Sequence, residues 1–206
     1  MSWMATERFR TRTAPDGLAI VQELVNTHSL PGHGADLLAG LDVARHWLQV
    51  VAGHWAKVHG LEPPEVSLSA ADLDALRELR TVVREMLAIP PGRRSADPFR
   101  ATGAVLPRAQ TNLVSDERGR AAMIPAGTGA NWLASAIWSE ILLAQHDGRW
   151  SRVKLCREPR CRVAFYDASR NGSATWHNVR VCGNITNLRA SRARRKEADR
   201  GAQEGH

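Results

Sequence analysis

The chain has 206 residues, of which 43% are hydrophobic and 24% charged, and its formal net charge is +7 at pH 7. This length suits one ordinary domain with a small appendage, and the composition is typical of a globular protein rather than a disordered one. No apolar run approaches the roughly 18 residues that a membrane-spanning helix needs, so we expect no such helix.

The positive charge is unevenly distributed along the chain. Residues 1–148 contain 14 Lys and Arg against 16 Asp and Glu, whereas residues 149–206 contain 14 against 5. We therefore expect two parts, 1–148 and 149–206, and the basic excess of the second suggests a polyanion partner. A solvated basic tail has the same composition, so both interpretations stay open. The first residues, MSWMATERFRTRT, lack the apolar core of a secretory signal, and with only three cysteines the chain is expected in a reducing cytoplasm.

Helical periodicity predicts three helices in the first 90 residues. The segment GLAIVQELVNTH at 17–28 has one apolar face, and a longer segment over 35–60 is predicted to end at Gly60. Ser69 followed by Asp72 resembles a capping box, and the apolar stripe behind it ends at two prolines.

The next elements are a loop, a β-hairpin and a fourth helix. Residues 90–104 combine prolines, glycines and arginines and are predicted to form a mobile loop. TNLVSDERGRAAMIPAG at 111–127 fits a hairpin that turns near DERG, and 131–148 has the wide apolar surface of a buried helix. The predicted fold class is mainly α with a small β-hairpin (α+β).

No enzymatic motif is apparent in the first 148 residues. The sequence lacks G-x-S-x-G, the P-loop and G-x-G-x-x-G, and all three cysteines lie later. The repeated His-Trp pair at 46–47 and 54–55 places its histidines about two helical turns apart, too far to share one ion, so surface or half-buried histidines are expected. We expect no catalytic residue, and the sequence neither shows nor excludes a pocket for a small molecule.

All three cysteines and one histidine form a paired pattern, C-x4-C-x15-H-x4-C, over residues 156–182. Two close pairs joined by a longer loop suit a tetrahedral structural zinc ion, with the loop returning as a short hairpin. A segment of about 50 residues with few large apolar side chains also needs metal binding to stabilise its fold. The alternative is three buried thiols and an incidental histidine. The predicted ligands of one structural zinc ion are Cys156, Cys161, His177 and Cys182.

A basic helix is predicted after the last cysteine. Val181, Ile185 and Leu188 form an apolar face at its start, and along GNITNLRASRARRKEADR this face continues with arginines and a lysine, as expected of a helix anchored at its root. Guanidinium groups suit phosphates and guanine edges, and the loop DASRNGSATW adds an arginine and an asparagine. The predicted nucleic-acid contacts are Arg170, Asn171, Arg189, Arg192, Arg195 and Lys196.

These residues resemble a known family, the CGNR zinc finger. The resemblance rests on Cys156, Cys161, the stretch FYDASRNGSATWH and the tripeptide CGN at 182–184. The preceding part is similar to the helical ABATE domain, through LAIVQELVNTH and SAADLDALRELRTVVREML. The resemblance implies a stress-induced transcription regulator, cytoplasmic and bacterial, whose helical domain senses or dimerises and whose finger binds DNA.

The chain departs from the family pattern at two positions. His177 stands where the family has a cysteine, which implies a Cys3His site, and Ile185 replaces the arginine of the name-giving tetrapeptide. Asn26 and Thr27 match the family's NT motif, which either lines a sensor pocket or, as we favour, caps the first helix.

The sequence therefore predicts a zinc-dependent DNA-binding regulator with a structural metal. Two alternatives remain: an adaptor whose finger docks on an acidic protein, and a small-molecule-binding protein or enzyme in which the finger is a brace. A small-molecule effector in the helical domain and a homodimer are further options that the sequence leaves open.

Overall fold

The structure is a computed structural model that describes residues 3–94, 109–189, 191, 192, 194 and 195. The predicted α+β class with few strands is confirmed. The helices are α1 (Met4–Glu7), α2 (Ala19–Val25), α3 (Leu41–His59), α4 (Ala70–Ala88) and α5 (Gly129–His146), with short 3-10 turns at Asp16–Leu18, Pro91–Arg93 and Arg149–Arg152. Two antiparallel hairpins, β1 (Thr111–Ser115) with β2 (Ala121–Pro125) and β3 (Val153–Leu155) with β4 (Ala164–Tyr166), complete the fold.

Helices α2 to α5 enclose the main hydrophobic core. Helix α2 is buried along its whole length, including the polar Gln22 and Glu23, because other elements surround it. The Glu23 carboxylate accepts hydrogen bonds from the backbone N–H of Ala5, at 2.7 Å, and of Thr6, at 2.9 Å. These bonds satisfy a buried carboxyl group, whose pKa is raised by burial, and attach α1 to the core.

The predicted ends of α3 and α4 are mostly confirmed. Helix α4 begins at Ser69 with a reciprocal capping box, in which the Ser69 hydroxyl accepts from the Asp72 N–H and the Asp72 carboxylate accepts from the Ser69 N–H. Helix α3 ends at Gly60, whose φ of 68° is the left-handed conformation that suits glycine. The prediction that α3 begins near residue 35 was wrong.

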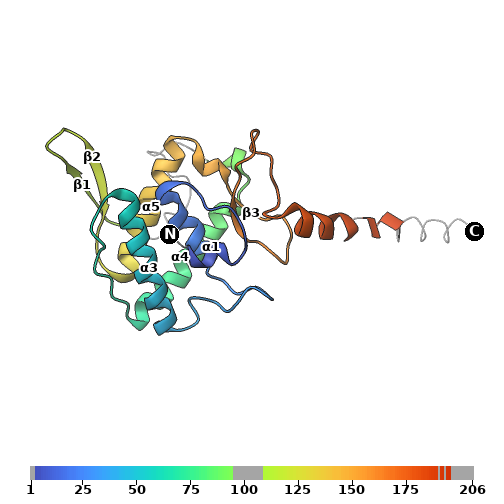
Figure 1. Ribbon diagram of the computed structural model, residues 1–206, viewed down its shortest axis with the longest axis horizontal. Coiled ribbons are helices and arrows are strands. Elements are labelled where there is room, and N and C mark those ends of the chain that lie inside the picture. Colours follow the sequence, from blue (N-terminus) through green and yellow to red (C-terminus); the bar gives the residue numbers. More distant parts are fainter. Residues whose placement is uncertain (1–2, 95–108, 190, 193, 196–206) are drawn as a thin grey trace, which may run out of the picture.

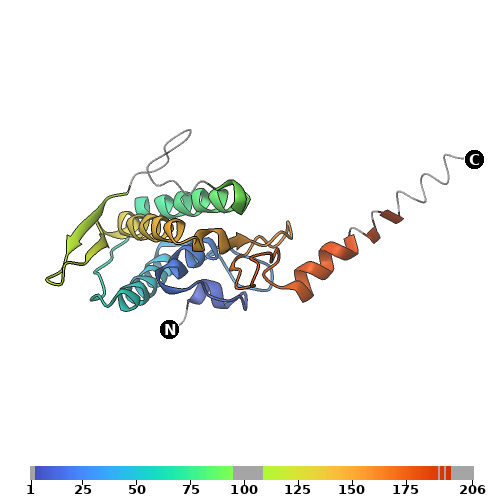
Figure 2. The ribbon, with the colours of Figure 1, turned by 90° about the horizontal axis from the view of Figure 1, so that it is seen from above.

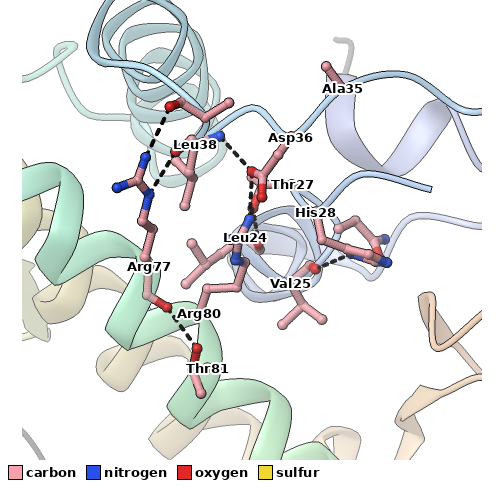
Figure 3. Close-up of polar contacts among 12 residues, drawn as sticks. Leu24, Val25, Thr27, His28, Ala35, Asp36, Leu38, Arg77, Arg80 and Thr81 are labelled. Carbon is pink, nitrogen blue, oxygen red and sulfur yellow. Dashed lines mark hydrogen bonds and ion pairs between the residues drawn. The ribbon is translucent and has the colours of Figure 1, made fainter.

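The chain before α3 folds as a turn because tertiary contacts capture it. The Asp36 carboxylate accepts from the backbone N–H of Leu38 at 2.8 Å and pairs with Arg80 of α4 at 2.7 Å (Figure 3). Leu38 is fully buried without being helical, so the apolar residues that extended the helical pattern reach the core from a loop.

The predicted hairpin at 111–127 forms as β1 and β2. Its turn is closed by the Asp116 carboxylate, which accepts from the backbone N–H groups of Arg118 and Arg120 at 2.9 Å each, and by Gly119 with a φ of 73°. In the segment 90–104, residues 91–93 form a 3-10 turn and Arg94 donates to the carbonyls of Trp150 and Val153, while residues 95–104 of the predicted loop lie outside the described residues.

The second hairpin, β3 with β4, attaches the cysteine-containing segment to the helices. Val153 and Ala164 from this hairpin belong to the main core, where both are fully buried. The domain boundary at 148 and 149 stays a prediction, and the packing is continuous across it.

The two exposed ends of the molecule lie far apart. Figure 1 shows the β1–β2 hairpin at one end and the last described helical residues, 184–189, 191, 192, 194 and 195, projecting from the other. Figure 2 shows the same arrangement from a perpendicular direction, with β3 and β4 between the helices and the projecting helix. Among the described residues, no helix is long and apolar enough to cross a membrane.

Candidate metal centre and basic helix

The first cysteine pair lies in the turn of the β3–β4 hairpin. The Cys156 N–H donates to the Val163 carbonyl at 2.8 Å and so extends the strand pairing beyond β3. The N–H groups of Cys161 and Arg162 both donate to the Glu158 carbonyl, at 2.9 and 3.2 Å, which makes the turn tight. Arg162 has a φ of 53°, in the left-handed region, so the chain reverses there to enter β4. The expected hairpin therefore encloses the first cysteine pair instead of following it.

The second pair, His177 and Cys182, is brought together by a single helical turn. A short π-helix, Val179–Gly183, begins at Asn178, whose side-chain oxygen accepts from the Val181 N–H at 3.2 Å. The Cys182 N–H donates to the Asn178 carbonyl at 2.9 Å. This turn places the Cys182 thiol beside the His177 ring, and the helix then continues through 184–189.

The four predicted ligands converge on one point. Their ligand atoms all lie within 4.8 Å of one another, and no other group of this kind occurs in the part of the chain that the structure describes. His177 Nδ1 lies 3.3 Å from Cys161 Sγ and 3.6 Å from Cys182 Sγ. Sulfur and nitrogen ligands of a tetrahedral zinc ion are about 3.6 Å apart, given Zn–S near 2.3 Å and Zn–N near 2.1 Å. The residues present fit one zinc ion, bound by His177 through Nδ1.

The cluster lies in a small hydrophobic core of its own. The three cysteines are between 0% and 6% exposed and pack with Phe9 and Val163, while Leu30 and Trp176 cover the edge. Before an ion binds, the hydrogen bond from Cys161 lowers the pKa of the Cys156 thiol, and burial raises the pKa of Cys182. The same hydrogen bond raises the pKa of Cys161, which remains the thiol. Phe9 comes from the N-terminal segment, and no local sequence pattern predicts this contact.

Glu158 links the first cysteine turn to the projecting helix. It is 3% exposed and forms an ion pair with Arg189, and its other oxygen lies 3.0 Å from the Thr186 hydroxyl. Burial opposes ionisation, but the hydrogen bonds from Arg189 and Thr186 lower the pKa of Glu158. The carboxylate is therefore a fixed anion at the helix root, and Arg189 is partly neutralised by it.

The loop between β4 and His177 is organised around Asp167. One carboxylate oxygen accepts from the Ser169 N–H at 2.9 Å and from its hydroxyl at 2.6 Å. The other accepts from the Ala174 N–H at 2.8 Å and from Lys154 at 2.7 Å. Although burial opposes it, these bonds lower the pKa of Asp167 to about 2. The aspartate and serine of the FYDASRN stretch thus hold the loop, and its tip presents Arg170 and Asn171, both exposed.

Only some of the basic residues predicted on the helix lie on its exposed surface among the described residues. Arg192 and Arg195 are exposed on the projecting helix, Arg189 lies at its root, and Lys196 lies outside the described residues. The expected apolar anchor is wrong: Val181 is 52% exposed and Leu188 is 56% exposed. The helix is held instead by the cysteine cluster and by Glu158.

Asn26 and Thr27 have structural roles that differ from each other. The Asn26 side chain pairs with the backbone of Ala164 in β4, accepting from its N–H at 2.8 Å and donating to its carbonyl at 2.9 Å. It therefore imitates a neighbouring strand and joins α2 to the finger, a contact that sequence reasoning missed because 138 residues separate the partners. The Thr27 hydroxyl donates to the Leu24 carbonyl at 2.7 Å and accepts a hydrogen bond from the Arg80 guanidinium at 3.0 Å (Figure 3). The expected helix cap is therefore confirmed for this residue.

Two family models match the chain in the places where these features lie. The model described as CGNR zinc finger matches residues 152–195, which include all four converging side chains. The model described as Putative stress-induced transcription regulator, the ABATE domain, matches residues 18–146, and no curated protein matches the chain. The chain contains a CGNR zinc finger whose Cys3His cluster could bind one zinc ion. Because the second match covers more than half of the chain, the chain belongs to the ABATE family.

Proposed function

We propose that this protein is a DNA-binding transcription regulator in which a structural zinc ion fixes a basic helix to a helical domain. The family description names a regulator, and the observation that most supports DNA binding is the projecting helix itself. It begins at a zinc ligand, extends away from the body, and exposes Arg192 and Arg195 with no acidic residue between 184 and 195. Such a surface suits phosphate contacts along a duplex.

Zinc would be held by Cys156, Cys161, His177 and Cys182. Four protein ligands complete a tetrahedral sphere, which leaves no position for a water molecule, so the ion would stabilise the fold rather than activate a nucleophile. The ligands join the hairpin turn to the root of the helix, and the ion would therefore keep the helix in a fixed direction. The Glu158 carboxylate, in the turn between the first two cysteines, is engaged by Arg189 and Thr186, which supports the same structural role.

Arg170 and Asn171 would form a second contact region. The Asp167 network holds their loop, and the exposed tip contains one side chain that suits guanine and one that suits adenine. The helix would supply mostly sequence-independent affinity through phosphates, and the loop would add base contacts.

The test is a titration of a random-sequence duplex by fluorescence anisotropy at several salt concentrations. The double variant R192A/R195A is expected to lower the slope of log K against log salt by about 1.8, because each lost phosphate contact contributes roughly 0.9. The matched control is R118A/R120A, which removes the same charge from the β1–β2 turn at the opposite end of the molecule. An unchanged slope in R192A/R195A, or an equal loss in the control, would reject the helix as the contact surface.

A protein partner is the second candidate, and one observation favours it. Val181 and Leu188 are more than half exposed on the helix that carries the arginines, and exposed apolar side chains beside charges are common at protein interfaces. An adaptor would bind no duplex at physiological salt in the anisotropy titration. Its complex would instead persist at high salt and be lost on replacing Leu188 with serine.

A further inference from the structure

A cavity of about 450 Å³ lies at the root of the projecting helix, where the N-terminal segment, the loop near Leu30 and the zinc finger meet. Phe9 and Leu30 form its wall on the side of the helical domain, and Val181 and Ile185 form its wall on the side of the finger. The cavity is therefore shared by both parts of the protein. Its size suits a small organic molecule, and its apolar walls suit a hydrophobic body.

The charges around this cavity are mostly positive. Four arginines line it, whereas Glu158 is its one carboxylate among the described residues, and that carboxylate is paired with Arg189. Arg8 donates to the carbonyls of Ala35, at 2.7 Å, and Asn26, at 2.6 Å, and the Glu23 and Asp36 carboxylates offset part of its charge. Three thiolates on a zinc ion would add a single negative charge, so the cavity would remain cationic with the metal bound.

Two of these arginines are available for a ligand. Arg10 and Arg160 are exposed, and neither forms an ion pair within the described residues. Arg10 also has a φ of 50°, a left-handed conformation that costs an arginine about 1 kcal/mol or more. A strained backbone that turns a charged side chain to the rim of a cavity is typical of a functional position.

We propose that this cavity binds a small amphipathic anion, with its hydrophobic body between Phe9 and Ile185 and its carboxylate or phosphate at Arg10 and Arg160. A DNA phosphate is a poor match, because a bare phosphodiester gains nothing from apolar walls on two sides. The hydrophobic body thus separates this ligand from the polyanion proposed for the helix.

The site also suggests how the ligand acts, and this part rests on the proposed DNA binding. Val181, Ile185 and Arg192 follow one another along nearly the same face of the helix, at intervals of four and seven residues. An anion at the root would therefore compensate positive charge next to the duplex. The ligand is expected to weaken DNA binding and act as a negative effector.

The direct test is calorimetric titration of the zinc-loaded protein, without DNA, with three probes that share one ring system. The probes are 2-naphthoate, 2-naphthylmethanol and 2-naphthylmethylamine, and inorganic phosphate is the fourth. We expect 2-naphthoate to bind at least tenfold more tightly than each of the others, since it alone combines a hydrophobic ring system with a negative charge. Equal binding of the neutral alcohol, tighter binding of phosphate, or no binding of 2-naphthoate at millimolar concentration would overturn the proposal.

The variant R10Q/R160Q is expected to bind 2-naphthoate about tenfold more weakly, while R118Q/R120Q should bind it with unchanged affinity. Both pairs are exposed, and thermal unfolding of each variant checks that the fold is intact. If R10Q/R160Q bound 2-naphthoate with unchanged affinity, the proposal that the anion binds at Arg10 and Arg160 in this cavity would be rejected.

The second measurement is the anisotropy titration with saturating 2-naphthoate, where DNA affinity should fall. If the protein binds no duplex even without 2-naphthoate, the proposed function fails. The calorimetric titration then still shows whether the cavity binds the anion. If the duplex binds and 2-naphthoate binds without changing its affinity, the effector role is rejected.

Discussion

The candidate zinc ligands are individual side chains whose protonation would have to change on metal binding. The pKa of Cys156 is lowered by its hydrogen bond from Cys161, whereas the pKa values of Cys161 and Cys182 are raised. At neutral pH the empty cluster is therefore expected to contain one thiolate and two thiols. Metal binding requires three thiolates, so the two remaining protons must leave.

The first prediction is that zinc binding releases about two protons near pH 7. Falling pH opposes this release, so zinc affinity should decrease as the solution becomes more acidic. Calorimetric titration of the metal-free protein with zinc, in buffers of different ionisation enthalpy, measures the number of protons. Release of no proton would mean that the thiols are already ionised.

The second prediction concerns Asp167, whose pKa is lowered to about 2 by Lys154 and Ser169. A folded-state pKa about 2 units below the ordinary value corresponds to about 2 kcal/mol of stability, present above pH 4 and lost as the pH falls through about 2. D167N should lose about this amount at pH 7 in chemical denaturation. The matched change D116N in the exposed β1–β2 turn should cost less than half as much.

At the scale of elements, the strand β4 is held between two unlike neighbours. On one side it pairs with β3, and on the other the Asn26 side chain replaces a strand by bonding to both backbone groups of Ala164. Gln22 adds a bond of 3.2 Å to the same carbonyl. Helix α2, buried throughout, thus positions the hairpin that contains the first cysteine pair.

The third prediction is that N26A destabilises the protein by about 2 kcal/mol, because it leaves the buried N–H of Ala164 without an acceptor. Gln22 still satisfies the carbonyl, which limits the loss. Chemical denaturation measures the change, and N112A on the exposed strand β1 is the control, expected to lie within about 0.5 kcal/mol of the parent. A small effect of N26A would show that water replaces the side chain.

At the scale of the whole molecule, the described residues form two hydrophobic clusters of unequal size. The main core extends from α2 to β4, whereas the second consists of Phe9, Val163 and the three cysteines, with two partly buried neighbours. We expect the second cluster to need a bound metal ion, since so few apolar side chains bury too little surface to hold three thiols and a histidine together. The first cluster needs no metal ligand.

The fourth prediction is that chelation unfolds the finger and spares the helical part. Hydrogen exchange should become fast over residues 156–163 and 177–189 after zinc removal, while α3, α4 and α5 keep their protection. Re-addition of zinc should restore the original pattern. Loss of protection in α4 and α5 as well would show that both clusters unfold together.

Local sequence was sufficient for the features that depend on local chemistry. The capping box at Ser69, the end of α3 at Gly60 and the β1–β2 turn are confirmed because neighbouring residues fix them. The four candidate metal ligands could be chosen from sequence because two close pairs at short spacing suit a tetrahedral ion, and their side chains converge.

Tertiary structure alone decided how those parts connect. The start of α3 depends on Arg80 reaching Asp36, the position of β4 depends on Asn26, and the projecting helix is held by Glu158 instead of by its own apolar face. The cavity at the helix root likewise combines Phe9 with Ile185, which lie far apart in the chain. Periodicity and spacing describe the structure that one segment can form by itself. These contacts join polar groups that are far apart in the sequence, and they form only on packing, because a polar group that becomes buried needs a hydrogen-bond partner.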